Sequence, residues 1–282
     1  MYEQRPLDRA KGLVVTYAAF SVYLVGVLFL AVGVYRLWSG LVPPKYLNWL
    51  LLPGTLVAEM AYIFGCLITG GEVRRAKLMD GGGKGGAKGK SGGGEAEPAT
   101  DASARLGFFG PLLAAILVVA ACGAGVLVID HLLGEPVMGA FSAEPTLLDP
   151  KLPTSMADFW GQLRRQVNLA EQMLNSWLEL DWLDWHVPAF LYLAACLSIR
   201  VAPVRRPMRP TLLAVILAGA VIAVLAAAWP RFNRTLDGLW PLLTYIWTLL
   251  LMLLLASLLV RGIVGLVRAF AGKEKAAKSS SQ

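Results

Sequence analysis

The chain has 282 residues, of which 56% are hydrophobic and only 16% are charged. A soluble globular protein is about half apolar and about a quarter charged, so this chain carries more apolar side chains than one water-facing core can bury. The composition excludes an ordinary soluble enzyme and a disordered scaffold, and it indicates a polytopic membrane protein. The net charge of +7 does not indicate a nucleic-acid partner, because Lys and Arg stand in short clusters between apolar runs.

Six apolar runs have, or nearly have, the roughly 20 helical residues needed to cross a membrane core of about 30 Å. They cover residues 13–37, 46–69, 107–129, 185–203, 211–229 and 239–260. We therefore predict an all-α polytopic membrane protein with about six transmembrane helices. The fourth run is the weakest, because His186 and Arg200 flank a short apolar centre.

The distribution of positive charge predicts the orientation of these helices. When Arg36 and Arg200, at the ends of the first and fourth runs, are counted with the adjoining loops, 19 of the 26 Lys and Arg residues fall in the two termini and in the loops after the second and fourth runs, and seven fall in the other three loops. Cytoplasmic loops carry the excess of positive charge, so we predict an integral, multi-pass protein with both termini in the cytoplasm. The three cysteines lie inside apolar runs without metal-ligand spacing, which favours small buried side chains over disulfides.

A glycine- and lysine-rich segment separates the first two helices, in residues 1–79, from the third, in residues 106–133. Residues 81–94 read GGGKGGAKGKSGGG, and residues 95–104 continue as EAEPATDASA. Neither stretch can bury apolar surface, so we predict a disordered cytoplasmic linker over residues 80–105. The glycines lack the spacing of a phosphate-binding loop.

The loop over residues 134–184 is predicted to be extracytoplasmic and to contain an amphipathic helix over residues 155–180. Ser155 followed by Asp158 is typical of a helix start. Apolar residues then recur at steps of three and four, at Trp160, Leu163, Val167, Ala170, Leu174 and Trp177. This stripe either packs on the protein's own membrane helices, rests at the lipid interface, or docks a partner subunit. Trp177, Trp182 and Trp185 then fit an aromatic belt where the chain enters the bilayer before the helices of residues 185–270.

The second apolar run contains the one motif with chemical content. Pro53 suits the first turn of a helix, where a missing N–H costs little, and Gly70 and Gly71 suit its end. Glu59 lies inside this helix. An ionisable residue at membrane depth is costly, which makes Glu59 a candidate functional residue.

The order of residues around Glu59 resembles the core of site-2-protease-type membrane zinc metalloproteases. The similarity comprises Pro53-Gly54-Thr55, a five-residue window around Glu59, and the sequence CLITGGEVRRAKL at residues 66–78. In that family the window is His-Glu-x-x-His, whose two histidines bind zinc while the Glu acts as general base. A short strand commonly follows the helix in the family, which implies a short cytoplasmic strand or hairpin over residues 73–79.

The window departs from the family pattern at both metal positions. It reads Ala58-Glu59-Met60-Ala61-Tyr62, so only the general-base position is retained. The family's third ligand is an Asp, often followed by Gly, on a later membrane helix, and the nearest candidate is Asp237 before Gly238. The resemblance therefore implies a pseudoenzyme in which Glu59 is vestigial and no zinc or other cofactor is expected.

Three functions follow from these observations. The first is a non-catalytic membrane protein that acts as a binding or structural subunit of a membrane complex, with the lipid bilayer and other membrane-protein subunits as partners. The second is an active zinc metalloprotease with atypical ligands, and the third is a transporter or proton-relay protein that uses Glu59. His131 and His186, beside Asp130 and Asp184, make up either a metal or proton site at the outer rim or ordinary interfacial residues.

Overall fold

Helices make up most of the described part of the chain. The computed structural model describes residues 6–70, 72–75, 101–103, 109–142, 148, 155–203, 208–228 and 230–279. Its elements, in chain order, are α1 (Pro6–Leu41), α2 (Pro44–Leu50), α3 (Leu52–Ile68), β1 (Glu72–Arg75), β2 (Asp101–Ser103), α4 (Phe109–Leu133), α5 (Glu135–Ser142), α6 (Met156–Glu179), α7 (His186–Arg200), α8 (Met208–Ala228) and α9 (Pro230–Ser279).

Among the described residues, three helices are long and apolar enough to cross a membrane, as judged by their length and composition. They are the segments Ala18–Leu41 of α1, Phe109–Leu133, which is α4, and Leu239–Val267 of α9. The apolar parts of α3, α7 and α8 are shorter, and the 15 residues of α7 rise only about 22 Å at 1.5 Å per residue. The expectation of a helical protein with helices long and apolar enough to span a membrane is confirmed, whereas six full spans are not.

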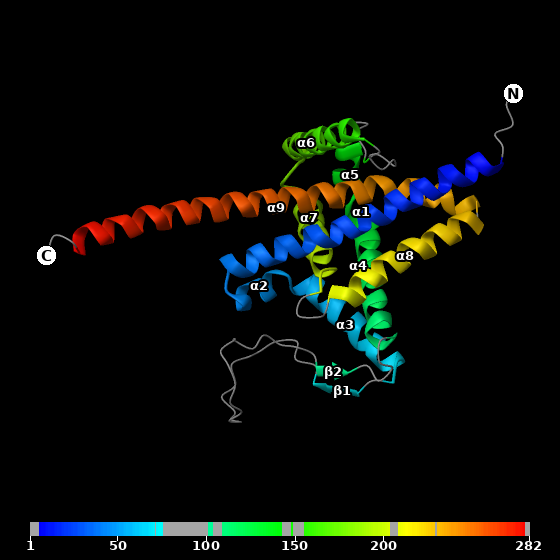
Figure 1. Cartoon of the computed structure of the whole chain (residues 1–282), viewed down its shortest axis with the longest axis horizontal. Helices are drawn as coiled ribbons and strands as arrows, with labels where there is room; N and C mark the ends of the chain where they lie inside the picture. Colours follow the sequence, from blue (N-terminus) through cyan, green and yellow to red (C-terminus); the bar gives the residue numbers. More distant parts are fainter. Residues whose placement is uncertain are drawn as a thin grey trace.

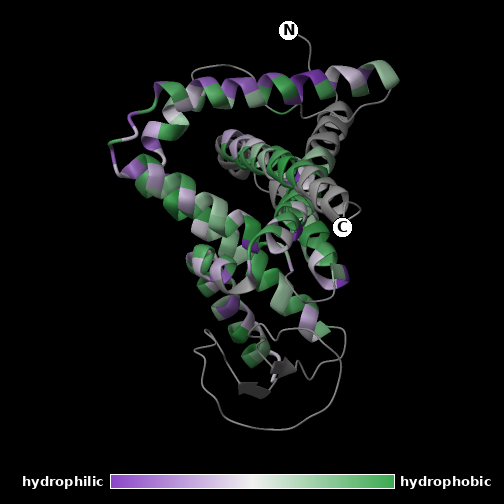
Figure 2. Ribbon diagram, turned by 90° about the vertical axis from the view of Figure 1, so that its left-hand side faces the viewer, coloured by the Kyte–Doolittle hydropathy of each residue, from purple (hydrophilic) through white to green (hydrophobic). Residues whose placement is uncertain are grey.

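The helices form two sets that cross. In Figure 1, α1, α8 and α9 run along the long axis of the molecule, whereas α4 and α7 run across it. Figure 2, turned by 90°, shows the helices of the long axis nearly end-on, so the crossing is not an effect of one viewpoint. Membrane helices tilt by about 20° on average, so in this arrangement the two sets cannot both lie close to one membrane normal.

The second predicted span, over residues 46–69, is in fact two helices. The chain bends at Leu51, which closes α2 and precedes α3, and Pro53 lies in the first turn of α3 as expected. The ring of Pro53 and its missing N–H prevent α2 from continuing as a regular helix. At the other end α3 stops at Ile68, and Gly70 has the left-handed φ of 68° that terminates many helices.

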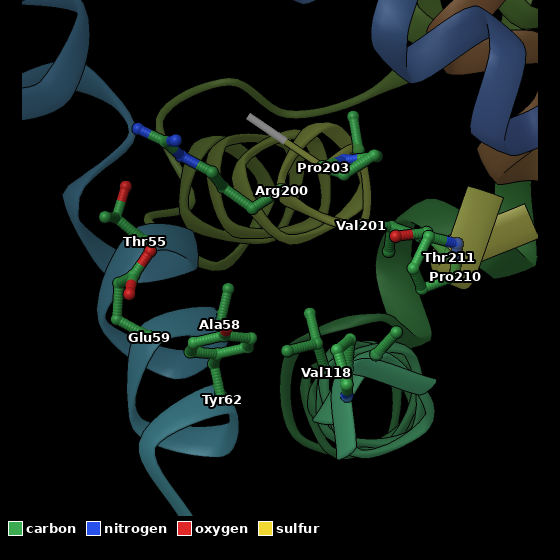
Figure 3. Close-up of a pocket in the computed structure, with 13 residues that line it drawn as sticks. Thr55, Ala58, Glu59, Tyr62, Val118, Arg200, Val201, Pro203, Pro210 and Thr211 are labelled. Carbon is green, nitrogen blue, oxygen red and sulfur yellow. The ribbon is translucent and has the colours of Figure 1, made fainter. Parts of the chain in front are cut away.

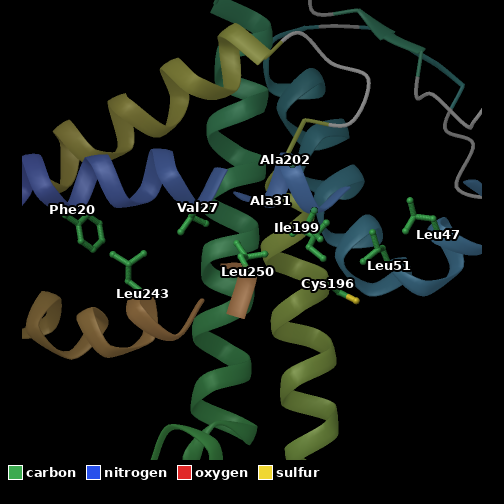
Figure 4. Close-up of a cluster of buried hydrophobic side chains, with 11 residues drawn as sticks. Phe20, Val27, Ala31, Leu47, Leu51, Cys196, Ile199, Ala202, Leu243 and Leu250 are labelled. Atoms are coloured by element: carbon green, nitrogen blue, oxygen red, sulfur yellow. The ribbon is translucent and has the colours of Figure 1, made fainter. Parts of the chain in front are cut away.

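A buried apolar cluster lies between α1, α7, α9 and the bend from α2 to α3. Figure 4 shows side chains from all of these elements meeting in it, including Val27, Leu51, Ile199 and Leu250. Beside it, the ring of Tyr23 meets the indole of Trp247 edge-on, with ring centres 5.4 Å apart. Tight packing of α1 on α9 therefore fixes the long axis of the molecule against α7.

A second cluster holds α5 and α6 against α7 and α9. Its buried members include Phe141, Met173, Phe190 and Tyr245. The helix start predicted at Ser155 is confirmed, because the Ser155 hydroxyl accepts from the Asp158 N–H while the Asp158 carboxylate accepts from the Ser155 N–H. These two bonds satisfy donors that a helix start otherwise leaves open.

A small antiparallel sheet lies at the end of the molecule opposite to α6 (Figures 1 and 2). In it, β1 pairs with β2 with Glu72 opposite Ser103 and Val73 opposite Ala102. Residues 101–103 belong to the segment predicted to have no structure, so that prediction is wrong for these three residues. Local composition could not show a pairing partner so far away along the chain. Residues 76–100 and 104–105, the rest of the predicted linker and strand, lie outside the described residues.

Candidate functional site

The motif residues of α3 line a cavity of about 140 Å³ between α3, α4, the end of α7 and the start of α8. Figure 3 shows the helices around this cavity, with Ala58, Glu59 and Tyr62 on the α3 side and Val118 on α4 opposite. Positions 58 and 62 lie one helical turn apart, so both face the same space. The described lining consists of Thr55, Ala58, Glu59, Tyr62, Pro111, Ala115, Val118, Arg200, Val201, Ala202, Pro203, Pro210 and Thr211.

Two glycines let α3 approach its neighbours closely enough to enclose the cavity. A Cβ added at Gly54 would meet the backbone carbonyl of Cys196 on α7, only 2.6 Å from its carbon. A Cβ added at Gly65 would lie 2.6 Å from the Cα of Ala114 on α4. Helix contacts through small residues bring backbones together and replace the hydrophobic driving force that is missing between helices in lipid.

The lining contains one carboxylate, one guanidinium, one phenol and two threonine hydroxyls. No imidazole and no thiol stands among the described residues that line the cavity. Glu59 is half-buried, whereas Ala58, at the position of the first family histidine, is buried and has no donor atom. A hydrolytic zinc site needs three protein ligands of suitable type, and this set offers one carboxylate and a phenol.

Arg200 is the cavity residue that the sequence analysis did not identify as part of a site. Its side chain is only 8% exposed. The guanidinium donates to the Asn48 side-chain oxygen at 3.1 Å, and it lies 5.5 Å from the ring centre of Tyr35. An arginine at the end of an apolar run is ordinary, and Asn48 precedes it by 152 residues, so no local pattern reveals the contact. Arg200 joins the end of α7 to α1 and α2.

We expect Arg200→Ala to destabilise the protein by about 2–4 kcal/mol, because the variant loses a charge-assisted hydrogen bond and a cation–π contact. Thermal unfolding in detergent measures the effect. Arg200→Lys keeps the charge without the planar fork and should recover only part of the loss. The matched control is Arg209→Ala, at an exposed arginine of α8. An equal effect of the two alanine variants would contradict this role for Arg200.

Asp237, the candidate third ligand, lies in the first part of α9. Its side chain is outside the described residues. The described lining residues come from α3, α4, α7 and α8 and from the segment between α7 and α8, and none of them belongs to α9. The structure therefore leaves the role of Asp237 as a prediction.

The described residues do not form the metal site that the two histidines and two aspartates at the outer rim could have made. All four residues are described, yet the described part of the chain holds no group of three or more His, Cys, Asp or Glu side chains close enough for a metal ion. Instead, the His186 ring nitrogen lies 2.6 Å from the Asp184 carboxylate, within one turn at the start of α7. That hydrogen bond lowers the pKa of Asp184. The pair is a local helix-start interaction.

The predicted stripe of α6 is mostly exposed. Trp160, Leu163, Val167 and Leu174 are 59%, 45%, 63% and 47% exposed, whereas Trp177 is partly buried. The buried face of α6 instead consists of Leu169, Gln172, Met173 and Ser176. Of the three alternatives for the stripe, packing on the protein's own helices does not hold for its exposed members, because other residues of α6, among them Gln172 with its bond to the Phe141 carbonyl, take the inner positions.

Comparison of the chain with family models, curated proteins and solved structures gives no match in any of the three. The resemblance to the site-2-protease type therefore stays a prediction that rests on the residues around Glu59.

Proposed function

We propose that this chain is a non-catalytic membrane protein with the helical frame of a site-2-protease-type metalloprotease, acting as a binding or structural subunit of a membrane complex. One observation carries the proposal. The positions of the family's two histidines and its general base all line one cavity, and only the general base is retained there.

The chemistry of the cavity supports a role without hydrolysis. Zinc lowers the pKa of bound water to about 7 and so supplies hydroxide at neutral pH. A single carboxylate cannot do this alone. Arg200 lines the same cavity and adds a fixed positive charge, which opposes the entry of a metal cation.

The surface of the long helices supports a partner inside the membrane. On α9, Leu255, Leu259, Ile263 and Leu266 are each more than half exposed. Such a surface is compatible with lipid or with a helix of another subunit, because in a bilayer neither contact exposes apolar groups to water. Native mass spectrometry after extraction in a mild detergent tests for the subunit. We expect the 30.4-kDa chain to be detected in complex with a second membrane polypeptide. Detection of the chain only as a single polypeptide would contradict the structural role.

The proposal includes a topology of six membrane-embedded helices with both termini in the cytoplasm. We expect an impermeant maleimide added from outside to label Lys151→Cys and to miss Lys90→Cys. The native cysteines Cys66, Cys122 and Cys196 are buried and should contribute little background. Labelling after the membrane is permeabilised shows that both probes are reactive, and the reverse pattern in intact cells would overturn the orientation.

A further inference from the structure

The surface of helix α6 has three faces: one buried, one apolar and exposed, and one polar and exposed. The buried face is fixed to the protein, because the Gln172 side chain donates to the Phe141 carbonyl at 2.8 Å and the indole of Trp247 donates to Gln166 at 2.6 Å. The exposed apolar face is the stripe already described, extended by Leu178, which is 84% exposed. The third face is polar and exposed and consists of Arg164, Asn168, Glu171 and Asn175.

The three faces are well separated around the helix. At about 100° per residue, the centres of the buried, apolar and polar sets lie roughly 80° to 160° apart. A helix in water that packs on a protein needs only two faces, an apolar one inward and a polar one outward. A third, apolar face that points away from the protein indicates a further apolar contact, with lipid or with another protein.

The position of α6 indicates what that contact is. Figures 1 and 2 show α6 lying across the end of the molecule that α4 reaches, opposite to the small sheet. α4 is one of the three described helices with the length and apolarity of a membrane span, so a bilayer that α4 crosses, with α1, α8 and α9 along its plane, ends near α6. Leu132, near that end, is 67% exposed.

Aromatic residues continue the apolar face of α6 into the start of α7. Trp182 and Trp185 are 50% and 63% exposed, and Leu183 between them is 95% exposed. Tryptophans concentrate where a chain passes from water into the bilayer. The exposed apolar surface of α6 therefore runs into a segment with the composition of a membrane boundary.

We propose that α6 lies in the membrane–water interface, with its buried face on α5 and α9, its polar face in water and its stripe among the upper acyl chains of the bilayer. The occupant of the stripe is lipid, and a second copy of the chain or another subunit is the competing occupant. The inference depends on the chain being a membrane protein and not on the motif around Glu59.

The test uses an environment-sensitive fluorophore on single cysteines in proteoliposomes of phosphatidylcholine that contain a brominated phosphatidylcholine. The stripe probes are Leu163→Cys and Val167→Cys, and the matched controls are Arg164→Cys and Asn168→Cys on the polar face of the same helix. The labelling is done with Cys66, Cys122 and Cys196 left in place, since all three are buried. High lipid-to-protein ratios keep copies of the chain apart.

We expect the brominated lipid to quench the stripe probes at least about threefold more than the control probes, because the apolar face of an interfacial helix sinks about 5–10 Å into the bilayer boundary. Equal quenching of the two pairs would overturn the proposal. The proposal would also be overturned if the lipid did not quench the stripe probes and their emission shifted with the density of protein in the membrane. That result would show that a second copy of the chain covers the stripe. Glu59→Gln should leave the quenching unchanged, so failure here and failure of the proposed function are separable.

Discussion

Gly54→Ala will disrupt the packing of α3 on α7, whereas Gly123→Ala will not harm the protein. The added methyl at position 54 meets the backbone carbonyl of Cys196, which cannot rotate away as a side chain can. Overpacking of this kind costs about 1–3 kcal/mol, even though alanine favours a helix over glycine by about 1 kcal/mol. A methyl at position 123 of α4 meets nothing within 4 Å, so that variant should be neutral or slightly stabilised.

Thermal unfolding and size-exclusion chromatography of both variants in the same detergent give the comparison. The Gly54 variant should show a lower unfolding midpoint and a larger aggregated fraction. If the unfolding curves of the two variants coincide, α3 does not contact α7 as closely as the structure indicates.

Restoring two histidines tests whether a third zinc ligand lies opposite α3. In the double variant Ala58→His, Tyr62→His the imidazoles stand one turn apart on the face of α3 that lines the cavity. Zinc takes such a pair together with a carboxylate. If Asp237 or another acid lies opposite the two imidazoles, we expect the double variant to bind up to one zinc per chain, where the unmodified protein binds none.

Two further variants identify the third ligand in that double variant. Asp237→Asn should abolish the new zinc binding if Asp237 occupies the family's third-ligand position, and Glu59→Gln should preserve it because the general base is not a ligand. If the double variant binds no zinc, the resemblance to the metalloprotease family extends no further than the sequence of α3.

Local patterns predicted the parts of the fold that depend on neighbours in sequence. The Ser155–Asp158 helix start, the place of Pro53 and the helix end at Gly70 each depend on a few adjacent residues, and each is present. Hydropathy also located the apolar helices, although α1 begins at Pro6 and α9 extends from Pro230 to Ser279, well beyond their predicted runs. Length and apolarity do not encode the angle between helices, so the crossing of the two sets could not be predicted.

Contacts between distant residues account for what the sequence analysis missed. Gln172 and Ser176 are polar, yet they lie on the buried face of α6, and Gln172 does so because the Phe141 carbonyl accepts its hydrogen bond. Arg200 is held at the cavity by its contacts with Tyr35 on α1 and Asn48 on α2. The grouping of Ala58, Glu59 and Tyr62 was predictable from helical spacing, but the guanidinium on the other side of the cavity was not.

The zinc content of the unmodified protein tests the central claim most directly. The protein is purified in detergent without chelators, and its metal content is measured by mass spectrometry beside that of the double-histidine variant. We predict less than about 0.1 zinc per chain, because the described residues of the cavity offer no ligand set of the kind that holds structural or catalytic zinc. One tightly bound zinc per chain that is lost in Glu59→Gln or Asp237→Asn would contradict the non-catalytic assignment.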